Sequence, residues 1–278
     1  MMHMLRTPAE LRVWRDAQGA VAFVPTMGNL HEGHVRLVEE ARRHAPAVVA
    51  SVFVNPLQFG PGEDYERYPR TWESDCAKLV DAGCAAVFAP AVADIYPRAQ
   101  TCFVAPPPLA DELCGAHRPG HFRGVLTVVL KLFNLVRPQV ALFGKKDYQQ
   151  LALVRDMAAQ FALPIAVVGV DTMRTDDGLA LSSRNGYLNM AECAEAPRLY
   201  RTLMVVAERL RAGERDFPHL EQDAAQALTR AGWKVDYVAV REAGTLAPAR
   251  AEGGAFVVLA AAWLGGTRLI DNLETTAA

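Results

Sequence analysis

The chain reads PTMGNLHEGH at residues 25–34, between an apolar segment and a stretch with helical periodicity. Residues 20–24, AVAFV, have the composition of a buried parallel strand, and from Val35 onward apolar residues recur at the spacing of one helix face. His31 and His34 are therefore expected at the entrance of a helix. There, unpaired backbone N–H groups and the positive end of the helix dipole favour an anion such as phosphate. This order predicts a phosphate-binding strand–loop–helix unit.

Two histidines in the pattern H-x-x-H can also simply cap a helix, and the pattern alone favours that interpretation. Here a strand, a loop containing Gly28 and a helix start accompany the pair, and Gly33 leaves room for a ligand to approach closely. The form H-x-G-H at residues 31–34 resembles the signature of class I nucleotidylyl transferases and aminoacyl-tRNA synthetases. Those enzymes direct attack on the α-phosphate of a nucleoside triphosphate and release pyrophosphate.

The composition is that of a globular protein with a weak case for nucleic-acid binding. Of the 278 residues, 51% are hydrophobic and 22% are charged, and the net charge is −2. A chain of this length buries roughly three quarters of the surface that its unfolded form exposes, and its length suggests about two domains. The charge balance argues against a large nucleic-acid footprint and so weakens a tRNA-binding role.

The five cysteines favour a reducing compartment. Their number is odd and no C-x-x-C occurs, so neither a disulfide framework nor a structural zinc site is expected. Charged residues interrupt the N-terminal segment before a signal-type apolar run forms, and the most apolar run, residues 255–264, has about half the length of a membrane span. We therefore expect a cytoplasmic protein without a membrane anchor.

Predicted helices and strands alternate up to about residue 185. The segment Thr7-Pro8-Ala9-Glu10 has the form of a capping box and predicts a helix from Pro8 to near Gly19. The pattern further predicts strands at residues 48–54, 85–89, 101–105, 140–143 and 165–170, and helices at residues 71–82, 124–136 and 147–161. This alternation is typical of an α/β fold with a doubly wound, Rossmann-like parallel sheet, whose ligands gather at the carboxyl ends of the strands.

A smaller C-terminal α+β domain is expected after residue 185. Helical periodicity at residues 191–211 and 218–231 is followed by strand-like segments at residues 235–240, 256–262 and 268–273. We therefore predict a nucleotide- and substrate-binding domain at residues 1–185 and a lid domain at residues 186–278. A lid would exclude water from a reactive intermediate.

Polar side chains follow two of the predicted strands. Gln58 lies in the loop NPLQFG, residues 55–60, where an amide can donate and accept hydrogen bonds without adding charge. Taken alone, this is as well interpreted as an ordinary loop. The run HRPGHFRG, residues 117–124, brings Arg118 and His121 to the start of an apolar helix, which suits phosphate or carboxylate. A solvated basic turn is the alternative there.

Two further polar segments occupy corresponding places. GKKDYQQ, residues 144–150, follows a strand, and lysine and aspartate adjacent at a helix start can hold the phosphates of a nucleotide. LSSRN, residues 181–185, supplies two hydroxyls and a guanidinium after the last strand of the sheet. It resembles the mobile serine–basic loop that accompanies H-x-G-H in the class I synthetases.

Five segments in this order resemble the sequence blocks of the pantothenate synthetase, or pantoate–β-alanine ligase, family. They are PTMGNLHEGH, FVNPLQFG with YPRT after it, RPGHFRGVLTVVLKLFNLVRP, LFGKKDYQQL and DGLALSSRNGYL. The resemblance covers essentially the whole chain. It implies a class I nucleotidylyl transferase type of fold and an ATP-dependent condensation of (R)-pantoate with β-alanine through a pantoyl adenylate, which yields pantothenate, AMP and diphosphate. It also implies a homodimer, and Mg²⁺ as an accompanying ion whose ligands stay unassigned.

The resemblance also implies roles for individual residues. His31 and His34 would stabilise charge on the α-phosphate, with His34 as a proton donor, and Lys146 would contact the phosphates. Gln58 and Gln150 would bind pantoate or β-alanine, and Arg118 and His121 would support the site. ATP binding is assigned to Met27, Gly28, Asn29, Leu30, His31, Glu32, Gly33, His34, Gly144, Lys145, Lys146, Asp147, Met173, Leu181, Ser182, Ser183 and Arg184.

Two other functions compete with this one. A phosphopantetheine- or cytidylyl-type nucleotidyltransferase shares H-x-G-H but transfers the nucleotide onto a phosphate, and the two glutamine loops disfavour it. A non-catalytic nucleotide-binding module would bind ATP without turnover, and the presence of His34, Lys146 and Arg184 argues against it.

Overall fold

A computed structural model gives the structure of the protein and describes residues 2–276. The chain forms two compact units. The first comprises the chain up to Gly144 together with Leu153–Asp171, and the second comprises Lys145–Ala152 and the chain from Thr172 onward. Helix α7 (Tyr148–Gln160) therefore contributes residues to both units.

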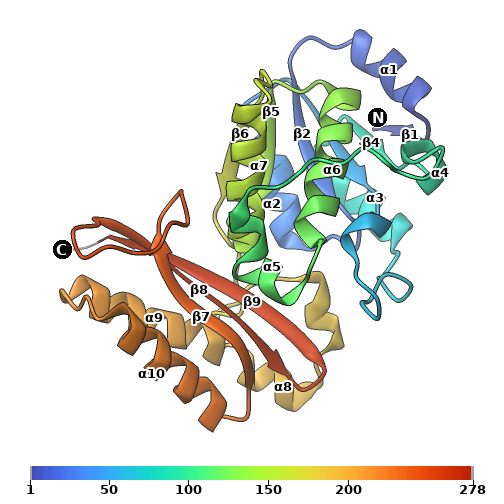
Figure 1. Cartoon of the computed structure of the whole chain (residues 1–278). Helices are drawn as coiled ribbons and strands as arrows, with labels where there is room; N and C mark the ends of the chain where they lie inside the picture. The colour runs from blue at the N-terminus through green and yellow to red at the C-terminus, as the bar shows by residue number, and fades with distance from the viewer. Residues whose placement is uncertain (1, 277–278) are drawn as a thin grey trace. The chain divides into compact units, whose positions relative to one another are not determined.

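The first unit is built on a six-stranded parallel sheet with the strand order β1-β4-β3-β2-β5-β6 (Figure 1). Its strands are β1 (His3–Leu5), β2 (Val21–Thr26), β3 (Ala47–Val52), β4 (Ala86–Phe88), β5 (Val140–Gly144) and β6 (Ala166–Val170). Its helices, besides part of α7, are α1 (Pro8–Asp16), α2 (Glu32–Ala41), η1 (Pro56–Gln58), α3 (Trp72–Asp81), α4 (Val92–Ile95), η2 (Pro108–Asp111), α5 (Cys114–His117) and α6 (His121–Val136). The chain passes from β2 outward to β3 and β4, and later to β5 on the other side of β2. This confirms the doubly wound sheet and places a topological switch point between β2 and β5, where open α/β sheets bind their ligands.

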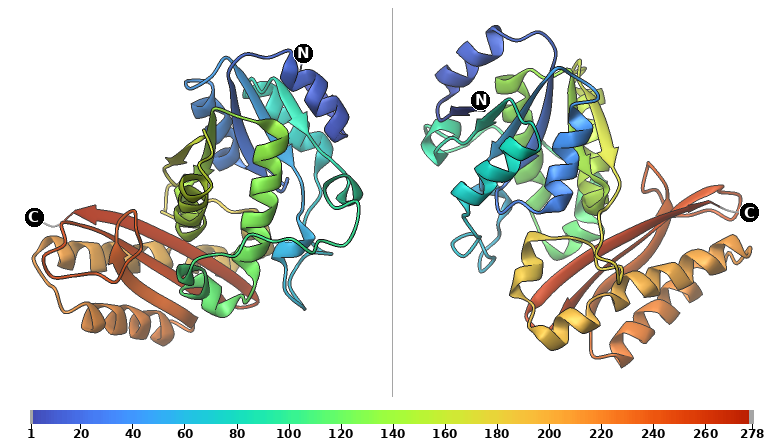
Figure 2. Two further views of the ribbon diagram at one scale, coloured as in Figure 1. Left: turned by 45° about the horizontal axis from the view of Figure 1, so that its top comes forward. Right: turned by 180° about the vertical axis from the view of Figure 1, so that it is seen from behind.

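Helices cover both faces of this sheet (Figure 2), which explains why its central strands are apolar throughout. Side chains of β2 alternate between the two faces. Phe23 meets Phe133 of α6 edge-on, with ring centroids 6.4 Å apart, whereas Ala22 and Val24 belong to a buried cluster with Leu37 of α2. Thr26, the last residue of β2, thus leads the chain out of the core and into the histidine loop.

One predicted strand of this unit is wrong and one strand was not predicted. Residues 101–105 form no strand. Val104 N donates to Thr127 Oγ1 of α6 at 3.1 Å. The N–H that a neighbouring strand would accept in a sheet is therefore hydrogen-bonded to a helix side chain instead. His3–Leu5 forms the edge strand β1 beside β4 and is too short to show periodicity. The other predicted elements are confirmed, although α6 begins at His121 rather than Gly124.

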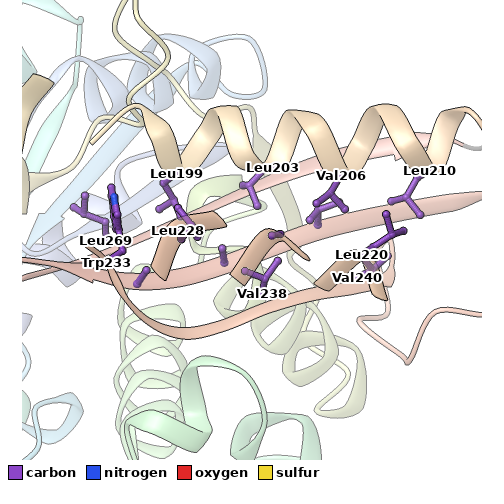
Figure 3. Packing of buried hydrophobic residues seen from close by; sticks show 14 of the residues in the cluster. Leu199, Leu203, Val206, Leu210, Leu220, Leu228, Trp233, Val238, Val240 and Leu269 are labelled. Atoms are coloured by element: carbon purple, nitrogen blue, oxygen red, sulfur yellow. The ribbon is translucent and has the colours of Figure 1, made fainter. Parts of the chain in front are cut away.

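The second unit combines an antiparallel sheet, in the order β7-β8-β9, with helices. Its elements are η3 (Lys145–Asp147), η4 (Ser183–Tyr187), α8 (Met190–Glu195), α9 (Arg198–Arg211), α10 (Phe217–Arg230), β7 (Lys234–Glu242), β8 (Ala255–Leu264) and β9 (Thr267–Thr276). Leu199, Leu203 and Val206 of α9 point from one helix face into a cluster with Val238 of the sheet (Figure 3). The single helix predicted at residues 191–211 is two helices, because Pro197 has no N–H with which to continue the first.

Residues 172–185 pack with the second unit. Arg174 forms a two-pronged ion pair with Asp271 of β9, at 2.6 and 2.9 Å, and Leu181 N donates to Met173 O at 2.9 Å. The boundary between the compact units therefore lies after Asp171, whereas the predicted functional division lies after residue 185. That functional division stays a prediction.

All five cysteines are free thiols. Cys84 is buried, and burial raises the pKa of its thiol to about 11. Across residues 2–276, no helix combines the length and apolar character that crossing a membrane requires.

Candidate active site

Both predicted histidines stand at the N-terminus of α2. His31 is the N-cap residue, and its Nδ1 accepts the N–H of Gly33 at 3.1 Å. His34 Nδ1 accepts the N–H of His31 at 3.3 Å, and the two rings lie 4.2 Å apart. A ring nitrogen that accepts a hydrogen bond carries no proton, so each neutral imidazole holds its proton on Nε2. The pair is therefore a set of two N–H donors at a helix N-terminus, which is suited to an anion.

The loop before the histidines is held by a carboxylate of α3. Asp75 is only 1% exposed, and its two oxygens accept the N–H groups of Asn29 at 2.9 Å and Leu30 at 2.8 Å. Gly28 and Asn29 both have positive φ angles, 87° and 51°. A Cβ on Gly28 would lie 3.0 Å from Val52 Cγ1 and 3.1 Å from Asp75 Oδ2, so glycine is needed both for the turn and for the close approach.

Gln58 lies at the end of η1, and its amide is oriented by Asn55. Asn55 Nδ2 donates to Gln58 Oε1 at 3.1 Å and to Gly124 O at 3.2 Å, while its Oδ1 accepts Leu57 N at 3.3 Å. If the Asn55 amide were flipped, its NH₂ group would face the N–H of Leu57 and its oxygen would face the carbonyl of Gly124. Both contacts would then be repulsive. Gln58 is therefore left with Nε2, a donor, which lies 3.1 Å from Met27 Sδ.

Gly124 allows this loop to lie against α6. A Cβ at Gly124 would overlap the carbonyl group of Leu57, so any larger residue would push η1 away. The hydroxyl of Tyr96 adds a hydrogen bond to Asn55 Oδ1 at 2.7 Å, and burial raises the pKa of Tyr96 well above its ordinary value. The Gln58 loop is thus a packed element rather than an ordinary solvated loop.

Arg118, the C-cap residue of α5, and His121, the first residue of α6, both contact Gln58. Arg118 forms a two-pronged ion pair with Glu63, at 2.6 and 2.8 Å, and His121 Nδ1 lies 2.8 Å from Gln58 O. The alternative of a solvated basic turn is therefore wrong for Arg118, whose guanidinium has specific partners.

A cavity of about 300 Å³ opens beside the histidine loop within the first unit. Met27, Gly28 and Asp75 line it, together with mainly apolar residues from the ends of β3 and β4 and the start of α3. Neither histidine nor Gln58 is among its lining residues. The cavity and the histidine pair therefore touch different parts of the same loop.

Other predicted residues lie in the second unit. Lys145, Lys146 and Asp147 form η3, directly after Gly144 at the carboxyl end of β5. Asn272 Nδ2 donates to the carbonyls of Lys145 and Lys146, both at 2.9 Å. Lys145 Nζ lies 2.7 Å from Glu274 Oε2, whereas the Lys146 ammonium has no ion-pair partner among residues 2–276. Gln150 follows on the first turn of α7.

The serine–basic segment is also ordered within this unit. Ser182 Oγ accepts Arg184 N at 3.2 Å and so caps η4, which contains Ser183 and Arg184. Leu181 is paired with Met173 through the backbone. The structure therefore brings together residues 27–34 with Gln58, Arg118 and His121 in the first unit, and Met173 with residues 181–184 in the second.

Comparison with known proteins decides the family. The family model described as pantoate-beta-alanine ligase matches residues 3–274. The chain belongs to the pantoate–β-alanine ligase family. Pantothenate synthetases of Thiobacillus denitrificans and Chromobacterium violaceum are 61% and 59% identical to it, covering 100% and 98% of this chain and 98% and 99% of theirs.

Solved structures of the family have the same fold. The pantothenate synthetase of Thermus thermophilus has a TM-score of 0.92 at 48% identity and covers 98% of this chain and 99% of its own. The pantoate-beta-alanine ligase of Francisella tularensis, complexed with beta-gamma ATP and beta-alanine, has a TM-score of 0.84 at 30% identity. It covers 98% of this chain and 97% of its own.

Mg²⁺ takes oxygen ligands, among which carboxylates are common. No group of three or more His, Cys, Asp or Glu side chains within residues 2–276 is placed to hold a metal ion. The carboxylate of Asp75 is occupied by two backbone N–H groups and by the Thr71 hydroxyl at 3.0 Å. The acidic, histidine and cysteine side chains of the described residues therefore offer no preformed cage for Mg²⁺.

Four residues that support the site were not singled out from the sequence: Asn55, Glu63, Asp75 and Tyr96. Asn55 carried a local signal, because asparagine before a proline is typical of a helix N-cap. Glu63 and Asp75 carried none, since their partners Arg118 and Leu30 lie 55 and 45 residues away along the chain.

Proposed function

We propose that this chain condenses (R)-pantoate with β-alanine, using ATP, to give pantothenate, AMP and diphosphate. In the first step a carboxylate oxygen of pantoate bonds to the α-phosphorus of ATP while the bond from that phosphorus to the bridging oxygen breaks and diphosphate leaves. In the second step the β-alanine amine bonds to the acyl carbon, the acyl–oxygen bond breaks, AMP leaves and the amine loses a proton. Both steps need positioning and charge stabilisation rather than an activated side-chain nucleophile, because pantoate is already ionised at neutral pH.

The observation that carries this proposal is the pair of Nε2–H donors at the N-terminus of α2. Negative charge builds on the α-phosphate oxygens and on the leaving diphosphate, and preorganised N–H donors stabilise such charge. We assign this role to His31 and His34, with His34 donating a hydrogen bond from its Nε2–H, and we also assign Lys146 to the phosphates. The second unit would contribute further ATP contacts through residues 145–147, 181–184 and Met173.

We assign pantoate to Gln58 and Gln150. The donor end of the Gln58 amide, set by Asn55, matches a carboxylate or hydroxyl oxygen of pantoate. A site built to donate to a substrate oxygen discriminates against analogues without it, because its polar group is then left unpaired. Arg118 and His121 would support this pocket from the start of α6.

The accompanying ion, the assembly and the location complete the proposal. We propose that Mg²⁺ enters bound to the triphosphate, as this ion commonly binds proteins through substrate phosphates. A homodimer is carried over from the family resemblance, and sedimentation of the purified chain tests it. The five free thiols support a cytoplasmic location.

Exchange of labelled pyrophosphate into ATP tests the reaction. With ATP and pantoate but no β-alanine, the protein should catalyse exchange, and β-alanine should then give one pantothenate and one AMP for each ATP. Exchange that depends on a phosphorylated acceptor instead would support a nucleotidyltransferase. ATP binding without exchange under any acid would support a non-catalytic module.

A further inference from the structure

Glu63 and Arg118 form a two-pronged ion pair between the loop after η1 and the segment before α6. Arg118 Nη2 lies 2.6 Å from Glu63 Oε2 and Arg118 Nε lies 2.8 Å from Oε1. The side chain of Arg118 is 18% exposed and that of Glu63 is 26% exposed. Solvent therefore screens this pair less than an ion pair on the open surface, which contributes little to stability. Burial alone raises the pKa of Glu63, but the hydrogen bonds and charge of Arg118 outweigh it and hold this pKa below its ordinary value. The pair is therefore ionised at neutral pH.

Arg118 also contacts one ring nitrogen of His121. Its Nη1 lies 3.0 Å from His121 Nε2, and a guanidinium has only donors, so Nε2 must accept. The proton of the neutral ring is therefore on Nδ1, which lies 2.8 Å from Gln58 O and donates to it. The Gln58 carbonyl, which can only accept, requires the same tautomer, so reorienting the guanidinium would leave His121 Nε2 without its donor but would not by itself change which nitrogen is protonated.

The two contacts converge on one carbonyl. Arg118 Nη2 lies 3.4 Å from Gln58 O, the oxygen that also accepts from His121. The side chain of Gln58 is held separately, by Asn55. Gln58 is thus held through its backbone by the start of α6 and through its amide by Asn55.

We propose that Glu63 is a positioning residue for the pantoate pocket. Its carboxylate holds Arg118 in the orientation that donates to His121 Nε2, and His121 in turn donates to the backbone carbonyl of Gln58. This inference rests on the proposed function, because Gln58 is assigned to pantoate there. Glu63 itself contacts no substrate.

The test compares Glu63→Gln with Glu66→Gln in the full-length protein. Glutamine keeps the size of Glu63 but opposes one donor prong of Arg118 with its own N–H₂ group, whereas Glu66 is an exposed acid of the same loop. In Glu63→Gln, Arg118 loses one hydrogen bond to a charged group, and we expect the KM for pantoate to rise about tenfold as a result. The KM for ATP should change by less than about twofold. Glu66→Gln should match the wild type in both constants.

A second measurement reports directly on the contact between Arg118 and His121. In ¹⁵N spectra of labelled protein, with the His121 signals identified by their loss in His121→Gln, the wild type should show a protonated Nδ1. In Glu63→Gln the signal of the unprotonated Nε2 should shift, because that nitrogen loses its guanidinium donor. An unchanged pantoate KM together with an unchanged Nε2 signal overturns the inference, and so do equal rises in both KM values with an unchanged Nε2 signal. A wild type without pantoate-dependent exchange overturns the proposed function instead, while the spectra still decide whether Glu63 holds Arg118 against His121.

Discussion

The carboxylate of Asp75 accepts the backbone N–H of Leu30 at 2.8 Å, so a side chain of α3 holds the loop that precedes the two histidines. The neighbouring N–H of Asn29 reaches the other oxygen at 2.9 Å. Lys78, one turn further along α3, donates to Leu30 O at 2.5 Å. Both polar groups of the Leu30 peptide backbone are therefore satisfied by α3, and the loop is held in a conformation with positive φ angles that it would not keep alone.

Asp75→Asn should lower both stability and activity. An asparagine presents one N–H₂ group toward a backbone N–H, so one hydrogen bond is lost inside a buried site and two donors oppose each other. We expect a loss of about 2 kcal/mol in the free energy of unfolding and a lower kcat for adenylate formation. Urea unfolding and single-turnover kinetics measure these. Glu73→Gln, an exposed neighbour on α3, is the control, and an Asp75→Asn protein as stable as that control would contradict the role of Asp75.

His34→Ala and Lys146→Ala should each slow adenylate formation by at least about a hundredfold, because removing one stabiliser of transition-state charge typically costs that much. Rapid-quench measurement of pantoyl adenylate in a single turnover shows the effect. The fold should be retained in both variants, since the histidine is half-buried and the lysine makes no ion pair among the described residues. His44→Ala, at an exposed position beyond α2, should leave the rate unchanged. A normal rate in folded His34→Ala would place the α-phosphate elsewhere.

Gln58→Glu should impair pantoate binding more than Gln58→Ala. Alanine removes the Nε2 donor, for which we expect about a tenfold weaker pantoate affinity. Glutamate puts a negative charge where the donor stood and repels the pantoate carboxylate, so we expect a further loss of about tenfold. Titrations with pantoate and with ATP separate the two ligands, and Gln160→Glu at the exposed end of α7 serves as a control. Equal losses for both ligands would indicate collapse of the loop.

The sequence predicted the strand–loop–helix unit around the histidines because its signals are local: an apolar run, glycines and a helical repeat. The same logic failed at residues 101–105, where Val104 is buried and its N–H donates to Thr127 of α6 rather than to a neighbouring strand. Contacts such as those of Asp75 with the loop and Glu63 with Arg118 join residues far apart in the chain. No periodicity or spacing could indicate them, and only the folded sheet brings them together.

Glu221→Gln should stabilise the protein at neutral pH but not in acid. Burial raises the pKa of Glu221, partly offset by the Val240 N–H that its Oε1 accepts at 2.8 Å. A carboxyl group whose pKa is raised on folding favours the folded state fully only below its unfolded pKa, and this contribution is lost as the pH rises through the folded pKa. Glutamine keeps the acceptor without the charge. The melting temperature at pH 7 should therefore rise by about 1–2 °C, and the difference should vanish near pH 4.

The control for this prediction is Glu208→Gln, at an exposed position on α9, whose melting temperature should follow the wild type at both pH values. A Glu221→Gln protein that melts below the wild type at pH 7 would show that the ionised carboxylate is favourable where it lies.

Asn272→Ala should slow adenylate formation although Asn272 is far from Lys146 in the sequence. The Asn272 amide donates to the carbonyls of both Lys145 and Lys146, and it is one of the contacts by which η3 belongs to the same compact unit as β9. Without it, two carbonyls at a partly buried site lose their donor, and the backbone that carries the Lys146 ammonium is less restrained. Misplacing a charge-stabilising group by a fraction of an ångström lowers the rate more than it lowers binding. We therefore expect about a tenfold lower kcat with a nearly unchanged KM for pantoate.

Asn272→Asp should be worse than Asn272→Ala, because a carboxylate would face the same two carbonyl oxygens and repel them. Thr276→Ala, exposed near the end of the same strand, should behave as the wild type. Single-turnover rates and melting temperatures of the three variants decide the matter. If Asn272→Ala forms adenylate at the wild-type rate, the link between β9 and η3 serves only the fold of the second unit, and Lys146 acts on ATP without it.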